Sequence, residues 1–182
     1  FIGLELAEAL AKRGVQVQLL TRSERLLNGF ERPFAQPLFD ELFRHGAELI
    51  VGEQVEGIEG RNGQVVAVST DKGRYAADLV LLATGLEPGA ELARSAGIAL
   101  GQSGAIAVND RMKTDVVGIW AAGDCIEVKH VVTGEPVYAP LALTANRTGR
   151  IAGDNVGAQS AGKTSSQRFR GTAGTLIAKV FG

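Results

Sequence analysis

The sequence predicts an α/β fold. Three observations favour this class: helical and strand patterns alternate at the start of the chain, one long apolar run ends in Thr84-Gly85, and a shorter apolar segment ends in Gly123-Asp124. Open α/β sheets bind ligands at the carboxyl ends of their strands, so both endings mark candidate sites. Glycine lets a ligand approach the main chain, and a carboxylate accepts hydrogen bonds from sugar or sugar-alcohol hydroxyls.

The first elements alternate in type. Residues 1–14 carry apolar side chains at helical spacing and end at Gly14, a natural helix stop. Residues 15–20 are rich in branched side chains, which is typical of a strand. A second amphipathic helix is expected over residues 34–45, and a short strand over residues 48–51.

A small antiparallel meander is expected next. The turn pairs Asn62-Gly63 and Lys72-Gly73 separate strand-like segments at residues 55–59 and 65–69. Such pairs favour tight hairpin turns, so the meander interrupts the α/β alternation.

The remaining elements return to strands and helices. Residues 77–83 form an apolar run of the buried-strand type. The other expected elements are a short helix at 90–97, strands at 105–108 and 119–122, a helix that starts at Pro140 and continues through 141–153, and a polar linker at 159–170.

The first helix and strand predict half of a dinucleotide site. Gly3 opens a helix that leads into a strand, where a larger side chain would block helix–strand packing. That strand ends in Thr21-Arg22-Ser23 and not in an acid. An acid there would bind the ribose 2′-hydroxyl of NAD, whereas a basic residue with a hydroxyl neighbour suits the 2′-phosphate of NADP. The pattern favours NADPH, or weak discrimination between NADPH and NADH.

Bulk composition excludes several classes. A net charge of -1 and an aromatic fraction of 5% argue against a nucleic-acid partner. No apolar run approaches the roughly 20 residues that cross a bilayer. The single cysteine excludes an internal disulfide and favours a reducing, cytoplasmic setting. Because the first residues begin inside a helical pattern, we expect the chain to be an internal piece of a longer protein.

Five segments carry a family resemblance. They are Phe1-Ile-Gly-Leu-Glu-Leu-Ala-Glu8, Ala83-Thr-Gly-Leu-Glu-Pro88, Thr114 to Asp124, Tyr138 to Arg150, and Gly171 to Phe181. The first three resemble the ordered motifs of the pyridine nucleotide-disulfide oxidoreductases, and the last two look most like the branch of coenzyme A-disulfide reductases and NADH oxidases.

The resemblance implies a Rossmann-like NAD(P)-binding domain at residues 1–103, with its antiparallel meander. Part of an FAD-binding domain would follow at 104–160, and a linker with the start of a C-terminal dimerisation domain at 161–182. On the nucleotide side, Gly3 would pack the cofactor turn and Glu5 would contact the nicotinamide carboxamide. Thr84 and Gly85 would lie against the dinucleotide, beside Thr21 and Arg22.

On the flavin side, the resemblance places Gly123 and Asp124 at the ribityl chain of FAD. Pro140, Leu141 and Ala142 would direct a helix N-terminus toward the flavin pyrimidine ring, where N–H groups and the helix dipole stabilise negative charge.

The implied activity passes hydride from NAD(P)H through flavin to a small-molecule disulfide or persulfide, such as coenzyme A disulfide, or to oxygen. Asn146 falls where this branch contacts coenzyme A, and the full-length protein would be a homodimer. No catalytic residue is expected within the chain, because the redox cysteine of the family lies in a preceding segment. Cys125 cannot be equated with it; it would react only if exposed, and free cysteines are usually small buried residues. His45 and His130 receive no role.

The alternatives to this function are a ferredoxin-type or mercuric-type reductase of the same fold, or a non-catalytic nucleotide-binding module.

Overall fold

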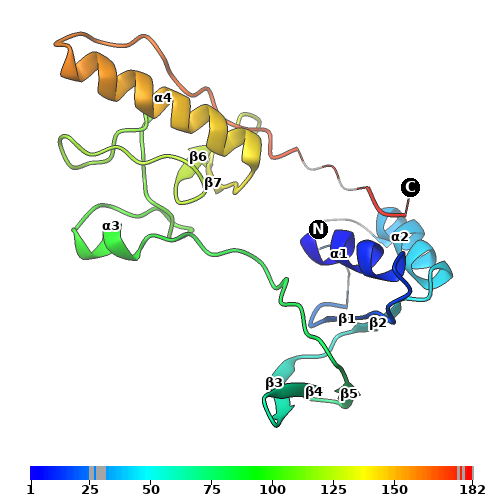
Figure 1. Ribbon diagram of the computed structural model, residues 1–182. Helices are drawn as coiled ribbons and strands as arrows, with labels where there is room; N and C mark the ends of the chain where they lie inside the picture. The colour runs from blue at the N-terminus through cyan, green and yellow to red at the C-terminus, as the bar shows by residue number, and fades with distance from the viewer. Residues whose placement is uncertain (25–26, 28–31, 176, 178, 182) are drawn as a thin grey trace. The chain divides into compact units, whose positions relative to one another are not determined.

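The computed structural model describes residues 1–24, 27, 32–175, 177 and 179–181 (Figure 1). Two compact units make up the chain. Unit 1 comprises Phe1–Thr84 with Ile177–Gly182, and unit 2 comprises Gly85–Leu176.

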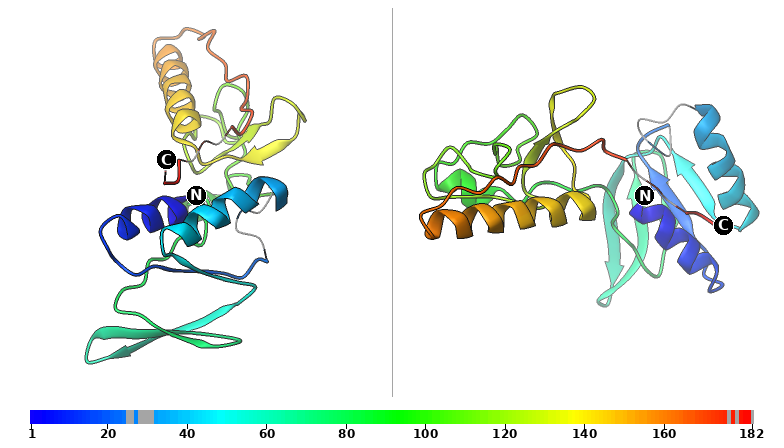
Figure 2. Two further views of the ribbon diagram at one scale, coloured as in Figure 1. Left: turned by 90° about the vertical axis from the view of Figure 1, so that its right-hand side faces the viewer. Right: turned by 90° about the horizontal axis from the view of Figure 1, so that it is seen from above.

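Unit 1 begins with the predicted alternation of helix and strand. Its elements are α1 (Ile2–Ala11), β1 (Gln18–Thr21), α2 (Arg32–Arg44) and β2 (Glu48–Val51). The two strands are parallel, and α1 and α2 lie on the same face of them (Figures 1 and 2). The core of this part consists of buried side chains from α1, from α2 and from the residue before β2. They are Leu4, Ala7, Leu42 and Ala47. The pairing of Thr21 with Val51 brings both carboxyl ends to one edge.

The predicted meander is confirmed. Strands β3 (Val55–Arg61), β4 (Gln64–Thr70) and β5 (Arg74–Ala76) pair antiparallel. Asn62 and Gly63 link the first two with φ angles of 54° and 79°. Two successive positive φ angles define the hairpin turn whose twist matches the flanking strands, which explains why Asn-Gly stands there.

The expected strand over residues 77–83 is not formed. The segment is extended but lies in no sheet, and Leu79, Leu81 and Leu82 are exposed at 64%, 50% and 74%. A strand needs a neighbouring backbone for its N–H and C=O groups, and no described strand pairs with this segment. Its apolar pattern alone could not supply that neighbour.

Unit 2 contains α3 (Glu91–Ser95), a hairpin of β6 (Glu127–Lys129) and β7 (Pro136–Tyr138), and α4 (Ala142–Ser160). Buried side chains from the connecting segments form its core, including Ile98, Ile106, Met112, Ile126 and Val128. The helix at 90–97 was expected, but the β6–β7 hairpin was not. Helix α4 begins two residues after Pro140 and runs past the expected end at Gly153, so Gln159 and Ser160, at the start of the expected linker, are helical.

The expected strands at 105–108 and 119–122 are reduced to single bridges. Ile106 bridges Leu100 and Ile126, and Trp120 bridges Lys113. The Ala121 N–H donates to Met112 O at 3.1 Å, so the segment before Gly123 is held by isolated contacts and not by a ladder. Apolar sequence predicted burial here, but regular pairing requires a parallel neighbour that the described residues do not provide.

Candidate functional site

The first predicted site residues lie at the carboxyl edge of the β1–β2 sheet. Thr21 is the last residue of β1, and its Oγ1 accepts a hydrogen bond from the Ser23 N–H at 3.3 Å. Arg22 lies between them, is exposed, and forms no hydrogen bond or ion pair with any described residue. A guanidinium that the surrounding residues leave unpaired remains available to an anion.

The two residues that follow β2 hydrogen-bond to the backbone of this strand end. The Glu53 N–H donates to Thr21 O and the Gly52 N–H donates to Ser23 O, both at 3.2 Å. Gly52 has a φ of 70°, and a Cβ there would lie 2.5 Å from Oε1 of Glu24. The backbone of the Thr21–Ser23 turn is therefore held in place, while the Arg22 side chain is exposed. Sequence reasoning identified Thr21 and Arg22 but missed Gly52 and Glu53, because their role depends on parallel pairing.

A second group of predicted site residues lies at the start of α1. A Cβ added to Gly3 would lie 3.4 Å from Cβ of Ala83, so larger side chains would push against the segment that ends at Thr84. Glu5 is exposed in the first turn of α1, where the helix dipole favours an acid. The structure thus brings the Gly3 turn and the residue before Thr84 side by side, although they are far apart in sequence.

In unit 2, the Gly123-Asp124 turn is fastened to α4. Gly123 has a φ of 87°, and its N–H donates to Thr148 Oγ1 at 3.1 Å. Thr148 is fully buried on α4, and its hydroxyl donates to Thr144 O at 2.8 Å. Thr148 was not predicted, because a threonine inside a helix gives no signal of a distant partner.

The start of α4 offers open backbone amides near Asp124. No side chain caps this helix, whose N-cap is Leu141, so the first-turn N–H groups that begin at Ala142 remain available. Tyr138, which ends β7 just before this start, has its pKa raised by burial first, and then by the charges of Asp124 and Cys125. Asp124 itself is exposed, and the residue before it, Gly123, is bonded to α4 through Thr148. Pro140 and Leu141 are half-buried.

Of the other residues in unit 2, Cys125 and Trp120 are packed and Asn146 is exposed, and the buried indole N–H of Trp120 has no hydrogen-bond partner among the described residues. Cys125 is half-buried, packs against the core of unit 2 and contacts Ala122 O through Sγ at 3.4 Å. Trp120 packs against the same core, with Lys113 Nζ 5.2 Å from its ring centre. Asn146 is exposed on α4. Among the residues that the structure describes, no cluster of three His, Cys, Asp or Glu side chains could hold a metal ion.

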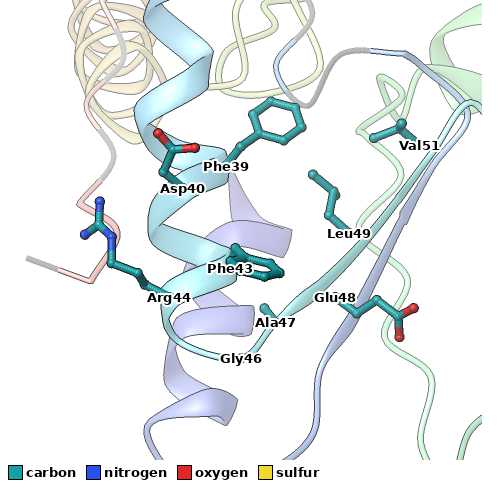
Figure 3. Close-up of a pocket in the computed structure, with 9 residues that line it drawn as sticks. All are labelled: Phe39, Asp40, Phe43, Arg44, Gly46, Ala47, Glu48, Leu49 and Val51. Atoms are coloured by element: carbon teal, nitrogen blue, oxygen red, sulfur yellow. The ribbon is translucent and has the colours of Figure 1, made fainter.

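A pocket of about 760 Å³ lies elsewhere in unit 1, between α2 and β2 (Figure 3). Its lining is Phe39, Asp40, Phe43, Arg44, Gly46, Ala47, Glu48, Leu49 and Val51. The Phe39 and Phe43 rings face the strand residues, whereas the charged tips of Asp40 and Arg44 turn away (Figure 3). None of the predicted site residues lines this pocket, so it is not part of the candidate site.

Taken by unit, the fold exposes two candidate features: the end of β1 with Arg22, which pairs with no described residue, and the Gly123-Asp124 turn, which is bonded to α4, a helix whose start no side chain caps. Residues 1–149 match the family model described as "Pyridine nucleotide-disulphide oxidoreductase". The chain belongs to this family. No helix among the described residues is both long enough and apolar enough to cross a membrane.

Two curated relatives and two solved structures illustrate the similarity. The NAD(P)H sulfur oxidoreductase (CoA-dependent) of Pyrococcus abyssi is 43% identical over 180 residues, which are 98% of this chain and 39% of the relative. The NAD(P)H coenzyme A polysulfide/persulfide reductase of Pyrococcus horikoshii is 41% identical, with the same coverage. This chain therefore spans about two fifths of the length of these relatives.

Among solved structures, an FAD-dependent pyridine nucleotide-disulphide oxidoreductase from Desulfovibrio vulgaris matches with a TM-score of 0.89 and 39% identity, over 100% of this chain and 45% of that one. An engineered water-forming NADPH oxidase bound to NADPH matches with a TM-score of 0.89 and 30% identity, over 100% of this chain and 39% of that one. These likenesses confirm the predicted α/β, Rossmann-like fold class.

Proposed function

We propose that this chain is part of an FAD-dependent oxidoreductase that takes hydride from NADPH or NADH and passes two electrons to a small acceptor. The acceptor is a disulfide or persulfide of the coenzyme A type, or oxygen. The Gly123-Asp124 turn, fastened by Thr148 beside the open start of α4, is the observation that carries the proposal. The names of the relatives support the acceptor classes, since they include a CoA-dependent sulfur oxidoreductase and a water-forming oxidase.

The residues of unit 2 fit a flavin. The exposed carboxylate of Asp124 can accept hydrogen bonds from ribityl hydroxyls, and Gly123 before it adopts a φ of 87°, which favours glycine. The α4 start, preceded by Pro140 and Leu141 and opened by Ala142, presents free N–H groups and the positive end of a helix dipole. FAD would supply the two-electron transfer, and these amides would stabilise negative charge that develops on the pyrimidine ring of the flavin.

The β1 edge fits the adenosine end of a dinucleotide, and NADPH fits it better than NADH. No acid stands at Thr21, and the unpaired Arg22 guanidinium suits a 2′-phosphate. The engineered NADPH oxidase offers a parallel. That enzyme carries three adjacent substitutions, to alanine, arginine and serine, downstream of a substituted glycine. The distance in sequence from that glycine to the three positions equals the distance from Gly3 to Thr21-Arg22-Ser23 in this chain.

Further assignments belong to the same proposal. Gly3 and Thr84-Gly85 line the dinucleotide, Glu5 contacts the nicotinamide carboxamide, and Asn146 contacts coenzyme A. Residues 1–103 serve as the NAD(P)-binding domain, 104–160 as part of the FAD-binding domain, and 161–182 as a linker into a dimerisation domain. The parent protein is a cytoplasmic homodimer. Its redox cysteine is distinct from Cys125, whose packing in the core leaves it poorly placed for an acceptor.

The intact parent protein provides the test. Its absorbance spectrum should show a flavin band that bleaches when NADPH is added and recovers when coenzyme A disulfide, a persulfide or oxygen is added. Replacement of Asp124 by alanine should lower flavin occupancy by on the order of tenfold, because charge-assisted hydrogen bonds are lost. Asp154→Ala is the matched control, since Asp154 is an exposed acid on α4 whose side chain forms no hydrogen bond or ion pair with any described residue. A purified parent without flavin, or full occupancy in the Asp124→Ala protein, would refute the proposal.

A further inference from the structure

A hydrogen-bond network joins the meander to the strand end that carries Arg22. Glu53 lies at its centre, two residues beyond the end of β2. Its carboxylate accepts a hydrogen bond at each oxygen: the Tyr75 hydroxyl donates to Oε1 at 2.8 Å, and the Thr70 hydroxyl donates to Oε2 at 2.6 Å. Its backbone N–H donates to Thr21 O at 3.2 Å. Glu53 therefore connects the end of β1, the end of β4 and the middle of β5.

The same junction is closed by the turn between β4 and β5. Thr70 is buried, and its Oγ1 accepts the N–H of Gly73 at 2.9 Å and the N–H of Lys72 at 3.2 Å. Lys72 Nζ in turn donates to Gly52 O at 2.7 Å. The Gly52 N–H donates to Ser23 O. Gly52 is therefore bonded to the meander through its carbonyl and to the Thr21–Ser23 turn through its N–H.

The Glu53 carboxylate is thus held by donors and kept from turning toward the strand end. The hydrogen bond to this carboxylate is also the largest reason why the pKa of Tyr75 is raised, since it favours the neutral phenol. The Glu53 backbone bonds to Thr21, next to Arg22, so a released Glu53 carboxylate would add negative charge near the end of β1 and oppose a bound phosphate. A mobile Thr21–Ser23 turn would also aim the Arg22 guanidinium poorly.

We propose that Tyr75 and Thr70 are positioning residues for nucleotide selection: by clamping Glu53, they fix the Thr21–Arg22–Ser23 turn and hold a negative charge away from the 2′-phosphate of NADPH. This inference rests on the proposed function. It adds the meander to the structures that determine nucleotide preference, and the residues that act need not touch the nucleotide. The predicted consequence is selective, because NADH lacks the phosphate that this arrangement favours.

The test compares dissociation constants of NADPH and NADH for the intact parent protein, measured by calorimetry. Tyr75→Phe removes only the hydroxyl and should weaken NADPH binding on the order of fivefold, the size expected when one hydrogen bond of a site is lost, while NADH binding changes by less than about twofold. Thr70→Val should act in the same direction, and Thr70→Ser, which keeps the hydroxyl, should restore the wild-type ratio. Turnover at saturating NADPH should be unchanged.

A control separates this role from general support of the sheet. Arg74→Gln removes the ion pair with Glu59, Nη2 to Oε2 at 2.9 Å, from the same meander without touching Glu53. This variant should leave the NADPH to NADH ratio unchanged. An equal loss of both nucleotides in Tyr75→Phe, or an unchanged ratio, would overturn the inference alone. A wild-type parent that binds neither nucleotide would overturn the proposed function and this inference together.

Discussion

Thr148 is a single hydroxyl that joins segments far apart in the sequence. It accepts the Gly123 N–H at 3.1 Å and donates to Thr144 O at 2.8 Å, so both of its hydrogen-bonding capacities are used. An apolar side chain of the same shape would leave the Gly123 amide without this partner, and an unpaired polar group in a packed site is costly. At the scale of residues, the proposed flavin site thus depends on the buried Thr148 hydroxyl, whose hydrogen bonds are made within the protein.

Tyr138 gives a pH-dependent prediction at the same scale. Burial is the first cause of its raised pKa, and the charge of Asp124 is the second. We expect Asp124→Asn to lower the pKa of Tyr138, because the neutral amide no longer opposes ionisation of the phenol. The measurement is the alkaline titration of phenolate absorbance, taken as the difference between the protein and its Tyr138→Phe variant, in each background.

The sign of the accompanying stability change follows from linkage. A phenol whose folded-state pKa lies above the ordinary value of 10.0 contributes stability that is fully present below that value. The contribution is lost as the pH rises through the raised pKa, and Asp124→Asn should reduce it. Asp154→Asn, on the exposed face of α4, should leave the titration unchanged. If Tyr138 titrates alike in both backgrounds, Asp124 does not lie where we place it.

At the scale of elements, the turn over residues 101–104 is built around one buried acid. Glu127 on β6 is 7% exposed, and its Oε1 accepts the Ser103 N–H at 2.7 Å. A Cβ on Gly101 would lie 1.5 Å from the other carboxylate oxygen, Oε2. Glycine is therefore required at this position by close approach of a side chain, and not by a positive φ.

Gly101→Ala should accordingly destabilise the protein. The carboxylate would have to leave its site and lose the bond to Ser103, at a cost of roughly 1–3 kcal/mol in the free energy of unfolding. Thermal or denaturant unfolding of the parent protein measures this change. Gly89→Ala is the matched control, because a Cβ there meets no atom within 4 Å and the φ is not positive. Equal stability of the two variants would show that Glu127 adapts at no cost.

The elements also show where prediction from sequence succeeds. Helices α1 and α2, the strands β1 and β2, and the Asn62-Gly63 hairpin depend on local spacing and turn chemistry, and all were predicted. Residues 77–83 and 119–122 have equally clear apolar patterns, yet form no ladder. Strand formation depends on a partner backbone, and an apolar pattern carries no information about whether one is adjacent.

At the scale of the whole molecule, the chain divides into two compact units that hold different parts of the candidate site. Unit 1 carries Thr21 and Arg22, and unit 2 carries Gly123, Asp124 and the start of α4. Separate units imply that substitutions in one should leave ligand binding by the other intact.

Thr21→Glu tests this separation in the intact parent. The new carboxylate would accept a ribose hydroxyl of NADH and repel the phosphate of NADPH, so the ratio of NADPH to NADH affinity should fall about tenfold, or roughly 1.4 kcal/mol. Flavin occupancy should stay at the wild-type level, as read from the absorbance spectrum. Release of flavin by this substitution would contradict the division, and an unchanged ratio would mean that the strand end does not read the ribose.

The sequence by itself determined the fold class and the family, and it predicted the residues of the candidate site: the Gly3 helix start, the Thr21-Arg22 strand end and the Gly123-Asp124 turn. These follow from short-range patterns that a chain carries in its order of residues. Only the tertiary structure decided what supports them, namely Glu53 clamped by Tyr75 and Thr70, and Gly123 held by Thr148. Supporting contacts join residues distant in sequence, and a hydroxyl or carboxylate shows its partner only when folding brings the two together.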